Sequence, residues 1–109
     1  MNNDTDFIAN LFYHPTENGG RKTPAKTGYR PQIKFDFTEN SSSGIQKFIG
    51  KEFVLPGEEV CAEITILSPS FFENKLEVGM QFIFSEGKVI IGTGKIIEIT
   101  NQTLKRASL

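Results

Sequence analysis

Residues 19–24 read Gly-Gly-Arg-Lys-Thr-Pro, and residues 28–32 read Gly-Tyr-Arg-Pro-Gln. Glycine and proline favour turns, so we expect a loop here that carries several cations. In the segment that follows, 33–38, large apolar residues alternate with polar ones. This period-two pattern is typical of a strand with one buried face. The sequence therefore predicts a cationic loop that leads into a strand whose three apolar residues face the core.

Further apolar segments alternate with turn residues through the rest of the chain. Besides 33–38, we expect strands at 6–13, 45–49, 59–68, 80–84 and 88–100. In the strand at 59–68, the inward row should consist of Val60, Ala62, Ile64 and Ile66. Gly92 and Gly94 interrupt the last strand and predict a bend or a bulge there. Six short strands without a convincing helical period predict an all-β fold, a small six-stranded antiparallel β-barrel, because closure removes unprotected edges.

Several short motifs follow the first loop in a fixed order. They are Val54-Leu55-Pro56-Gly57-Glu58, Leu67-Ser68-Pro69, Phe82, Glu86-Gly87 and Gly92-Thr93-Gly94. Together with 19–24 and 28–32, they resemble the C-terminal domain, domain III, of bacterial elongation factor Tu. The resemblance implies the same β-barrel, present here as a stand-alone domain without the GTPase domain. The expected layout is a disordered lead-in at 1–5, the barrel domain at 6–100 and a flexible tail at 101–109.

Length and charge limit the classes of function. A chain of 109 residues is long enough for one domain with its own core. Twelve cations against thirteen anions leave a formal net charge of -1, so no overall positive field attracts DNA or a membrane surface. One cysteine excludes an internal disulfide, and the N-terminal residues lack the pattern of a signal peptide. We expect a cytoplasmic protein with no DNA partner and no membrane partner.

Residues that could carry out catalysis are few. His14 is the only histidine and Cys61 the only cysteine, so a metal site would need several carboxylates, which structural zinc sites do not favour. Cys61 is expected to act as a small apolar residue of its strand and not as a nucleophile. The phosphate-binding pattern Gly-x-x-x-x-Gly-Lys-Ser/Thr is absent. We therefore expect no catalytic residues, no metal, no cofactor and no GTP bound by this chain alone.

The cationic loop has two interpretations. Arg21, Lys22 and Thr23 suit phosphate recognition, because charged groups on a glycine-rich loop can reach backbone oxygens. The other interpretation is a solvated hairpin loop. The resemblance implies RNA binding, since in elongation factor Tu this region contacts the T-stem backbone of aminoacyl-tRNA, and Glu86 and Gly87 match a hairpin that touches the same stem. These five residues are the RNA-binding candidates.

Two departures from the family weaken this candidate RNA site. Ser85 stands where the family commonly has an arginine before the Glu-Gly turn. Ser68 stands where the family has a basic or imidazole residue. With about three phosphate contacts left, affinity for tRNA is expected to be weak and to fall about forty-fold between roughly 50 and 200 mM salt.

The segment Ser70–Val78 is longer than the corresponding turn of the family, which faces the GTPase domain. Phe71 and Phe72 in this segment have two interpretations. They fold back under the barrel, or they present an apolar anchor to a partner, as exposed aromatic residues do at many interfaces. Both are therefore candidates for protein binding.

The neutral overall charge and the missing cations favour protein binding over RNA binding. We expect a non-catalytic binding module related to translation elongation, which docks a protein of the elongation factor Tu system. The alternative is a weak tRNA-stem binding module. An enzyme is a distant third possibility.

Overall fold

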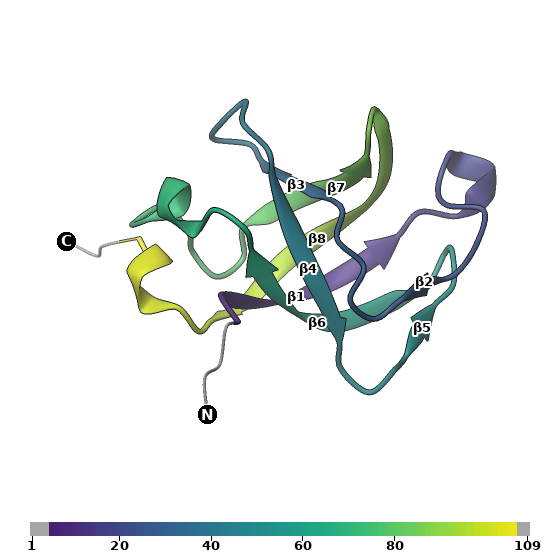
Figure 1. Cartoon of the computed structure of the whole chain (residues 1–109), viewed down its shortest axis with the longest axis horizontal. Coiled ribbons are helices and arrows are strands. Elements are labelled where there is room, and N and C mark those ends of the chain that lie inside the picture. Colours follow the sequence, from purple (N-terminus) through teal and green to yellow (C-terminus); the bar gives the residue numbers. More distant parts are fainter. Residues whose placement is uncertain (1–4, 107–109) are drawn as a thin grey trace.

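The computed structural model describes residues 5–106, whose regular structure consists mainly of short strands (Figure 1). Residues 1–4 of the expected lead-in and 107–109 of the expected tail lie outside the described residues. The strands are β1 (Phe7–Tyr13), β2 (Ala25–Lys26), β3 (Gln32–Phe35), β4 (Ser42–Phe48), β5 (Phe53–Val54), β6 (Glu59–Ile66), β7 (Gln81–Glu86) and β8 (Val89–Ile99). The described residues also form the 3-10 helices η1 (Thr16–Asn18), η2 (Pro69–Phe72) and η3 (Gln102–Leu104).

Six of the strands close into an antiparallel barrel. Their order around it is β1, β6, β4, β3, β7 and β8, and β8 pairs back onto β1. The predicted all-β fold with a six-stranded antiparallel barrel is therefore confirmed. The sequence did not predict β2 and β5, which form a separate sheet through the pairs Ala25–Val54 and Lys26–Phe53. Strands of two residues are too short for a period-two pattern to reveal.

Alternation along the strands builds the barrel core. The predicted inward row of β6 is confirmed, since its members are all buried: Val60, Ala62, Ile64 and Ile66. Phe7 of β1 and Phe82 of β7 pack edge to face inside the barrel, with ring centroids 5.7 Å apart. The expectation that Cys61 acts as a small apolar residue is wrong, because the same alternation turns its side chain outward and exposes it.

The strand predicted at 33–38 ends earlier than expected. β3 stops at Phe35, and Phe37 is 43% exposed, so the prediction that Phe37 faces the core is wrong. The chain turns after Phe35, where the Thr38 N–H donates to the Phe35 carbonyl oxygen at 3.5 Å. The ring of Phe37 stacks on that of Phe35, with centroids 5.6 Å apart. The turn therefore carries Phe37 to the rim of the barrel.

Gly92 and Gly94 lie on β8 opposite two phenylalanines of β7. A Cβ at either position would overlap a ring, that of Phe84 at Gly92 and that of Phe82 at Gly94. β8 continues through both glycines, and its register with β7 shifts between Phe84 and Ser85, next to Gly92. The predicted bulge is confirmed beside Gly92. Gly94 instead marks a close approach of an aromatic ring.

Residues 101–106 pack against the rest of the protein, so the prediction of a flexible tail is wrong for this part. Leu104 in η3 is fully buried. Backbone hydrogen bonds from Lys75 N to Leu104 O (3.0 Å) and from Arg106 N to Leu76 O (2.8 Å) join the segment to the loop after η2. The sequence prediction failed because a single buried leucine leaves no periodic pattern, and its contacts come from a distant loop.

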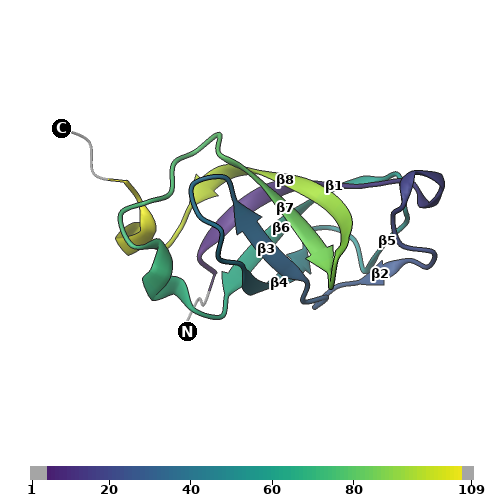
Figure 2. The same cartoon turned by 90° about the horizontal axis from the view of Figure 1, so that it is seen from above.

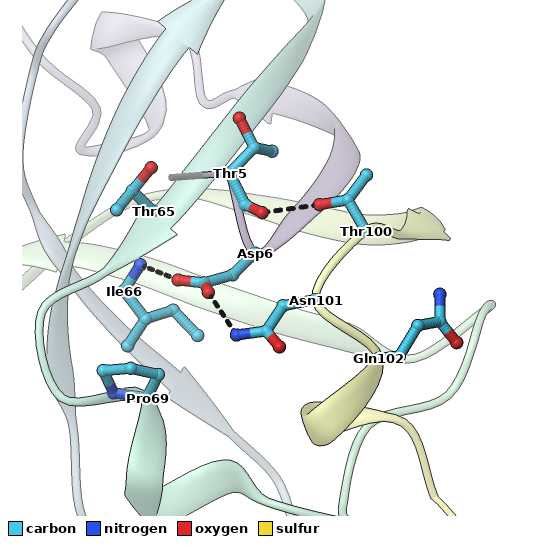
Figure 3. Close-up of a pocket in the computed structure, with 8 residues that line it drawn as sticks. All are labelled: Thr5, Asp6, Thr65, Ile66, Pro69, Thr100, Asn101 and Gln102. Carbon is cyan, nitrogen blue, oxygen red and sulfur yellow. Dashed lines mark hydrogen bonds between the residues drawn. The ribbon is translucent and has the colours of Figure 1, made fainter. Parts of the chain in front are cut away.

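Figure 3 shows a polar pocket at the point where the chain passes from the barrel into residues 101–106. The Asp6 carboxylate accepts hydrogen bonds from the backbone N–H of Ile66 (2.7 Å) and from the side-chain amide of Asn101 (2.9 Å). The Thr100 hydroxyl donates to the carbonyl oxygen of Thr5 at 2.6 Å. Thr5 is buried, so the expected disorder of the lead-in is wrong at this residue. These bonds tie both ends of the described chain to the barrel.

The loop after η1 lies near one end of the long axis, together with β2 and β5, and η2 and η3 lie near the other end, as both views of the ribbon show (Figure 1, Figure 2). Two groups of side chains are named after these ends. The Arg21 end consists of Arg21, Thr23, Tyr29 and Glu86. The Phe37 end consists of Phe37, Phe71, Lys75, Met80 and Arg106.

Candidate functional site

Arg21 is held by contacts within the protein. It lies in the loop after η1, where Gly19 adopts a left-handed φ of 89°, a conformation that glycine favours. Arg21 Nη1 donates to a carboxylate oxygen of Glu86, which lies at the β7–β8 hairpin. Its Nε donates to the Thr23 carbonyl at 3.2 Å, and its Nη2 donates to the Thr23 hydroxyl at 3.1 Å. All three guanidinium nitrogens therefore have partners, and the side chain is 20% exposed.

Tyr29 completes this group. Its hydroxyl donates to the same oxygen of Glu86, and the guanidinium carbon of Arg21 lies 4.7 Å from the centroid of its ring. Burial is the main cause that raises the pKa of Tyr29, and the hydrogen bond to Glu86 raises it further. Burial alone would lower the pKa of Arg21, but the contacts with Tyr29 and Glu86 outweigh it, so the pKa is raised. The charge of Arg21 is thus balanced by Glu86 inside the protein.

Tyr13 connects this group to the barrel core. Its ring centroid lies 6.4 Å from that of Tyr29 and 4.9 Å from that of Phe84. Its hydroxyl donates to the side-chain oxygen of Gln46, which is fully buried. Burial raises the pKa of Tyr13. The Arg21 end therefore rests on a row of packed side chains that begins inside the barrel.

Lys22 and Gly87 directly follow Arg21 and Glu86 in the chain. Lys22 is exposed, and no ion pair holds its side chain among the residues that the structure describes. Gly87 adopts a left-handed φ of 58° at the hairpin turn. Of the five RNA-binding candidates, the structure brings Arg21, Thr23 and Glu86 into direct contact. Lys22 takes no part in this network.

η2 turns its two phenylalanines in different directions. The ring of Phe72 is 2% exposed, and its centroid lies 5.6 Å from that of Phe35 and 6.2 Å from that of Phe37. Phe71 is 63% exposed. The first interpretation, burial under the barrel, therefore holds for Phe72 but not for Phe71, whose exposed ring is compatible with the second. The expectation that Phe72 itself contacts a protein partner is wrong, because its ring belongs to the core.

The Phe37 end contains residues that sequence reasoning missed. A hollow of about 210 Å³ lies between Phe37, Met80, Lys75, Arg106 and Asn74. A second hollow of about 330 Å³ shares Phe37 and Met80 with it. These side chains come from three separate segments of the chain. No local motif could have identified them, because the tertiary structure alone brings the segments together.

Residues 1–100 match the family model described as the elongation factor Tu C-terminal domain. The chain belongs to this family. The match includes the whole barrel and the Arg21 end, whereas Lys105 and Arg106 lie beyond it. Membership in the elongation factor Tu C-terminal domain family relates the chain to translation elongation.

The elongation factor Tu C-terminal domain is a non-catalytic part of its parent protein. Within residues 5–106 of this chain, no three His, Cys, Asp or Glu side chains gather in a way that could hold a metal ion. In the same described part of the chain, no helix has the length and apolar character needed to cross a membrane.

Proposed function

We propose that this member of the elongation factor Tu C-terminal domain family is a non-catalytic module that docks a protein of the elongation factor Tu system. The docking surface is the Phe37 end. The observation that carries the proposal is the exposed ring of Phe71 next to the buried ring of Phe72, which fixes η2 to the core. Exposed aromatic side chains on a rigid support are typical anchors of protein interfaces.

The charges at the Arg21 end support protein docking over RNA binding. A phosphate would have to replace the contacts of Arg21 with Glu86 and Thr23. The Glu86 carboxylate would then stand unpaired beside the RNA backbone. Since affinity for RNA depends on the number of phosphates neutralised, an arginine that is already paired contributes little.

Isothermal titration calorimetry with purified proteins tests the docking function. The probes are elongation factor Tu that lacks its own C-terminal domain and the nucleotide-exchange factor of the same host. Wild type is expected to bind one of them, and Phe71→Ala to weaken that binding by at least about tenfold, as loss of an interface anchor does.

Phe53→Ala is the matched control, because Phe53 is 52% exposed and lies on β5 at the other end of the barrel. It should leave the affinity unchanged. The proposal fails if neither protein binds, or if the two variants lose affinity equally.

Weak binding of a tRNA stem is the second candidate function. The observation that favours it is the exposed Lys22, whose charge is not paired within residues 5–106, on a loop next to the hydroxyl of Thr23. An ammonium group in this position can meet a backbone phosphate.

A hairpin RNA with the sequence of a tRNA T-stem, titrated by fluorescence anisotropy at several salt concentrations, tests this alternative. If RNA is the ligand, Lys22→Ala should reduce the slope of log affinity against log salt by about 0.7–0.9. Glu86→Gln should strengthen binding, because it releases Arg21 from its carboxylate. Lys105→Ala, at the opposite end, is the control. An unchanged slope in Lys22→Ala rejects the RNA function.

A further inference from the structure

We propose that the hollows around Phe37 bind a protein segment in which a large apolar side chain stands next to a carboxylate. This inference rests on the proposed docking function and names the chemistry of the docked partner. The apolar side chain lies against Phe37 and Met80, and the carboxylate pairs with Lys75 and Arg106.

The size of the hollows fits single side chains. Two of them, of about 210 and 330 Å³, meet at Phe37 and Met80, and a third of about 60 Å³ lies between Phe37 and Phe71. Sites for whole small molecules usually have roughly 300–1,000 Å³ in one enclosed space, and the larger of the two adjoining hollows reaches only the lower end of this range. Adjacent smaller hollows with Phe71 at their margin suit an extended peptide segment that places one side chain in each.

Lys75 and Arg106 provide the charge that the apolar surface lacks. Among residues 5–106, no ion pair engages the Lys75 ammonium. Arg106 Nη1 lies 3.6 Å from a carboxylate oxygen of Glu77, and both of these side chains are more than half exposed, 62% and 53%. Exposed pairs of this kind contribute little, at most about 1 kcal/mol. Arg106 can therefore exchange Glu77 for the carboxylate of a partner.

Backbone hydrogen bonds fix the two chain segments from which both cationic side chains extend. Lys75 N donates to the Leu104 carbonyl and Arg106 N to the Leu76 carbonyl, at 3.0 and 2.8 Å. The side chains of Leu76 and Leu104 are fully buried between the same two segments. The backbone of the loop after η2 and of the C-terminal segment is thus preorganised, so binding has to order only the side chains, which reduces the entropy lost.

The local charge balance favours a single carboxylate over a polyanion. The segments that line the hollows, 36–42, 71–81 and 101–106, carry four anions and three cations, which leaves a local net charge of -1. The anions are Asp36, Glu39, Glu73 and Glu77, and the cations are Lys75, Lys105 and Arg106. A nucleic acid backbone would be repelled by this surface, whereas one carboxylate between Lys75 and Arg106 meets two cations.

Selection of peptides from a random dodecapeptide phage library on the wild-type protein tests the inference. The comparison target is the double variant K75E/R106E. The control is K22E/K26E, which makes the same change of charge at two exposed lysines near the other end of the barrel. Circular dichroism should show the same folded spectrum for all three proteins.

Peptides recovered on wild type are expected to share an aspartate or glutamate within two positions of a phenylalanine, tyrosine, leucine, isoleucine or methionine. They should bind K75E/R106E at least about tenfold more weakly and K22E/K26E as tightly as wild type. In the amide NMR spectrum of the wild type, shifts on titration should concentrate at Phe37, Met80 and Arg106.

Failure to recover peptides, a consensus without a carboxylate, or equal binding to K75E/R106E overturns the inference. If the elongation factor Tu proteins lose affinity with Phe71→Ala but bind K75E/R106E as they bind wild type, docking stands and the carboxylate site is rejected. If the peptides behave as expected but neither elongation protein binds, the peptide site stands and docking to the elongation factor Tu system is rejected.

Discussion

The Arg21 end and the Phe37 end of the barrel differ in how they use their charged and aromatic groups. The Arg21 end carries its cations in a recognisable motif, yet Arg21 is paired with Glu86 and Thr23 inside the protein. The Phe37 end has no motif, yet it exposes Phe71 and leaves Lys75 without an ion pair among the described residues. A cation in a sequence motif is therefore a candidate for binding only after its partners in the fold are known.

The largest effect on stability is expected from Phe72, whose buried ring packs between the Phe37 end and the barrel core. Phe72→Ala should lower the free energy of unfolding by about 3–5 kcal/mol, because it leaves a cavity against Phe35 and Phe37. Urea unfolding followed by circular dichroism measures the loss. A change below about 1 kcal/mol would show that η2 is not fixed to the core, and the contrast between Phe71 and Phe72 would disappear.

The next effect concerns Tyr13, which supports the Arg21 end. Tyr13→Phe should lower the free energy of unfolding by about 1–3 kcal/mol at neutral pH, because the buried oxygen of Gln46 loses its donor. Urea unfolding at pH 7 measures the loss. Tyr29→Phe is the control for a tyrosine nearer the surface and should cost less.

The same variant should change the response to alkaline pH. Burial in the folded state raises the pKa of Tyr13 above its ordinary value of 10.0. The contribution of the protonated hydroxyl to folding stability is therefore complete below pH 10 and is lost as the pH rises further. Above about pH 10 the unfolded tyrosine loses its proton and the folded one keeps it, which lowers stability by about 1.4 kcal/mol per pH unit. Tyr13→Phe should remove this contribution from the slope of the free energy of unfolding against pH. An identical slope in both proteins would show that Tyr13 ionises equally in the two states.

A smaller effect is expected for the pair of Arg21 and Glu86. A double-mutant cycle with Arg21→Ala and Glu86→Ala should give a coupling energy of about 0.2–1 kcal/mol, because the Glu86 side chain is 45% exposed. The coupling should weaken in about 1 M salt, since ions screen exposed charges. A coupling of zero at low salt would mean that Arg21 is free to bind a ligand, and would restore the RNA interpretation of this end.

The smallest effect on stability is expected from Phe71. Phe71→Ala should change the free energy of unfolding by less than about 0.5 kcal/mol, since the ring is 63% exposed. The same urea titration compares it with Phe72→Ala. A larger loss would place Phe71 among the supporting residues of the barrel and would remove it as a partner anchor.

Much of the barrel could be predicted because its strands alternate regularly. The row Val60 to Ile66 and the pattern around Phe82 identify buried faces that the structure confirms. Phe37 continues the same pattern but lies beyond the end of β3, since a turn after Phe35 takes it out of register. Alternation shows which face a residue would occupy in a strand, and it contains no information on where the strand ends.

The candidate site was predictable in part. The motif around Arg21 and the hairpin at Glu86 were selected together, and the structure brings them into contact. The pairing of their charges was not predictable, because the two residues stand 65 positions apart and their separation in space depends on the closed barrel. The surface that includes Lys75 and Arg106 was missed for the same reason.

The amino-acid sequence was sufficient to identify the all-β barrel and its family, because both depend on local signals: alternation, turn glycines and motifs in order. The tertiary structure alone determined which cations are available for binding. In the loop of residues 19–24 that identifies the family, Arg21 is neutralised by a carboxylate from a distant hairpin. At the other end, a buried leucine from each of two distant segments fixes the backbone from which two exposed cationic side chains extend beside Phe37. Charge pairing and burial act through distances in space, and a linear pattern does not contain these distances.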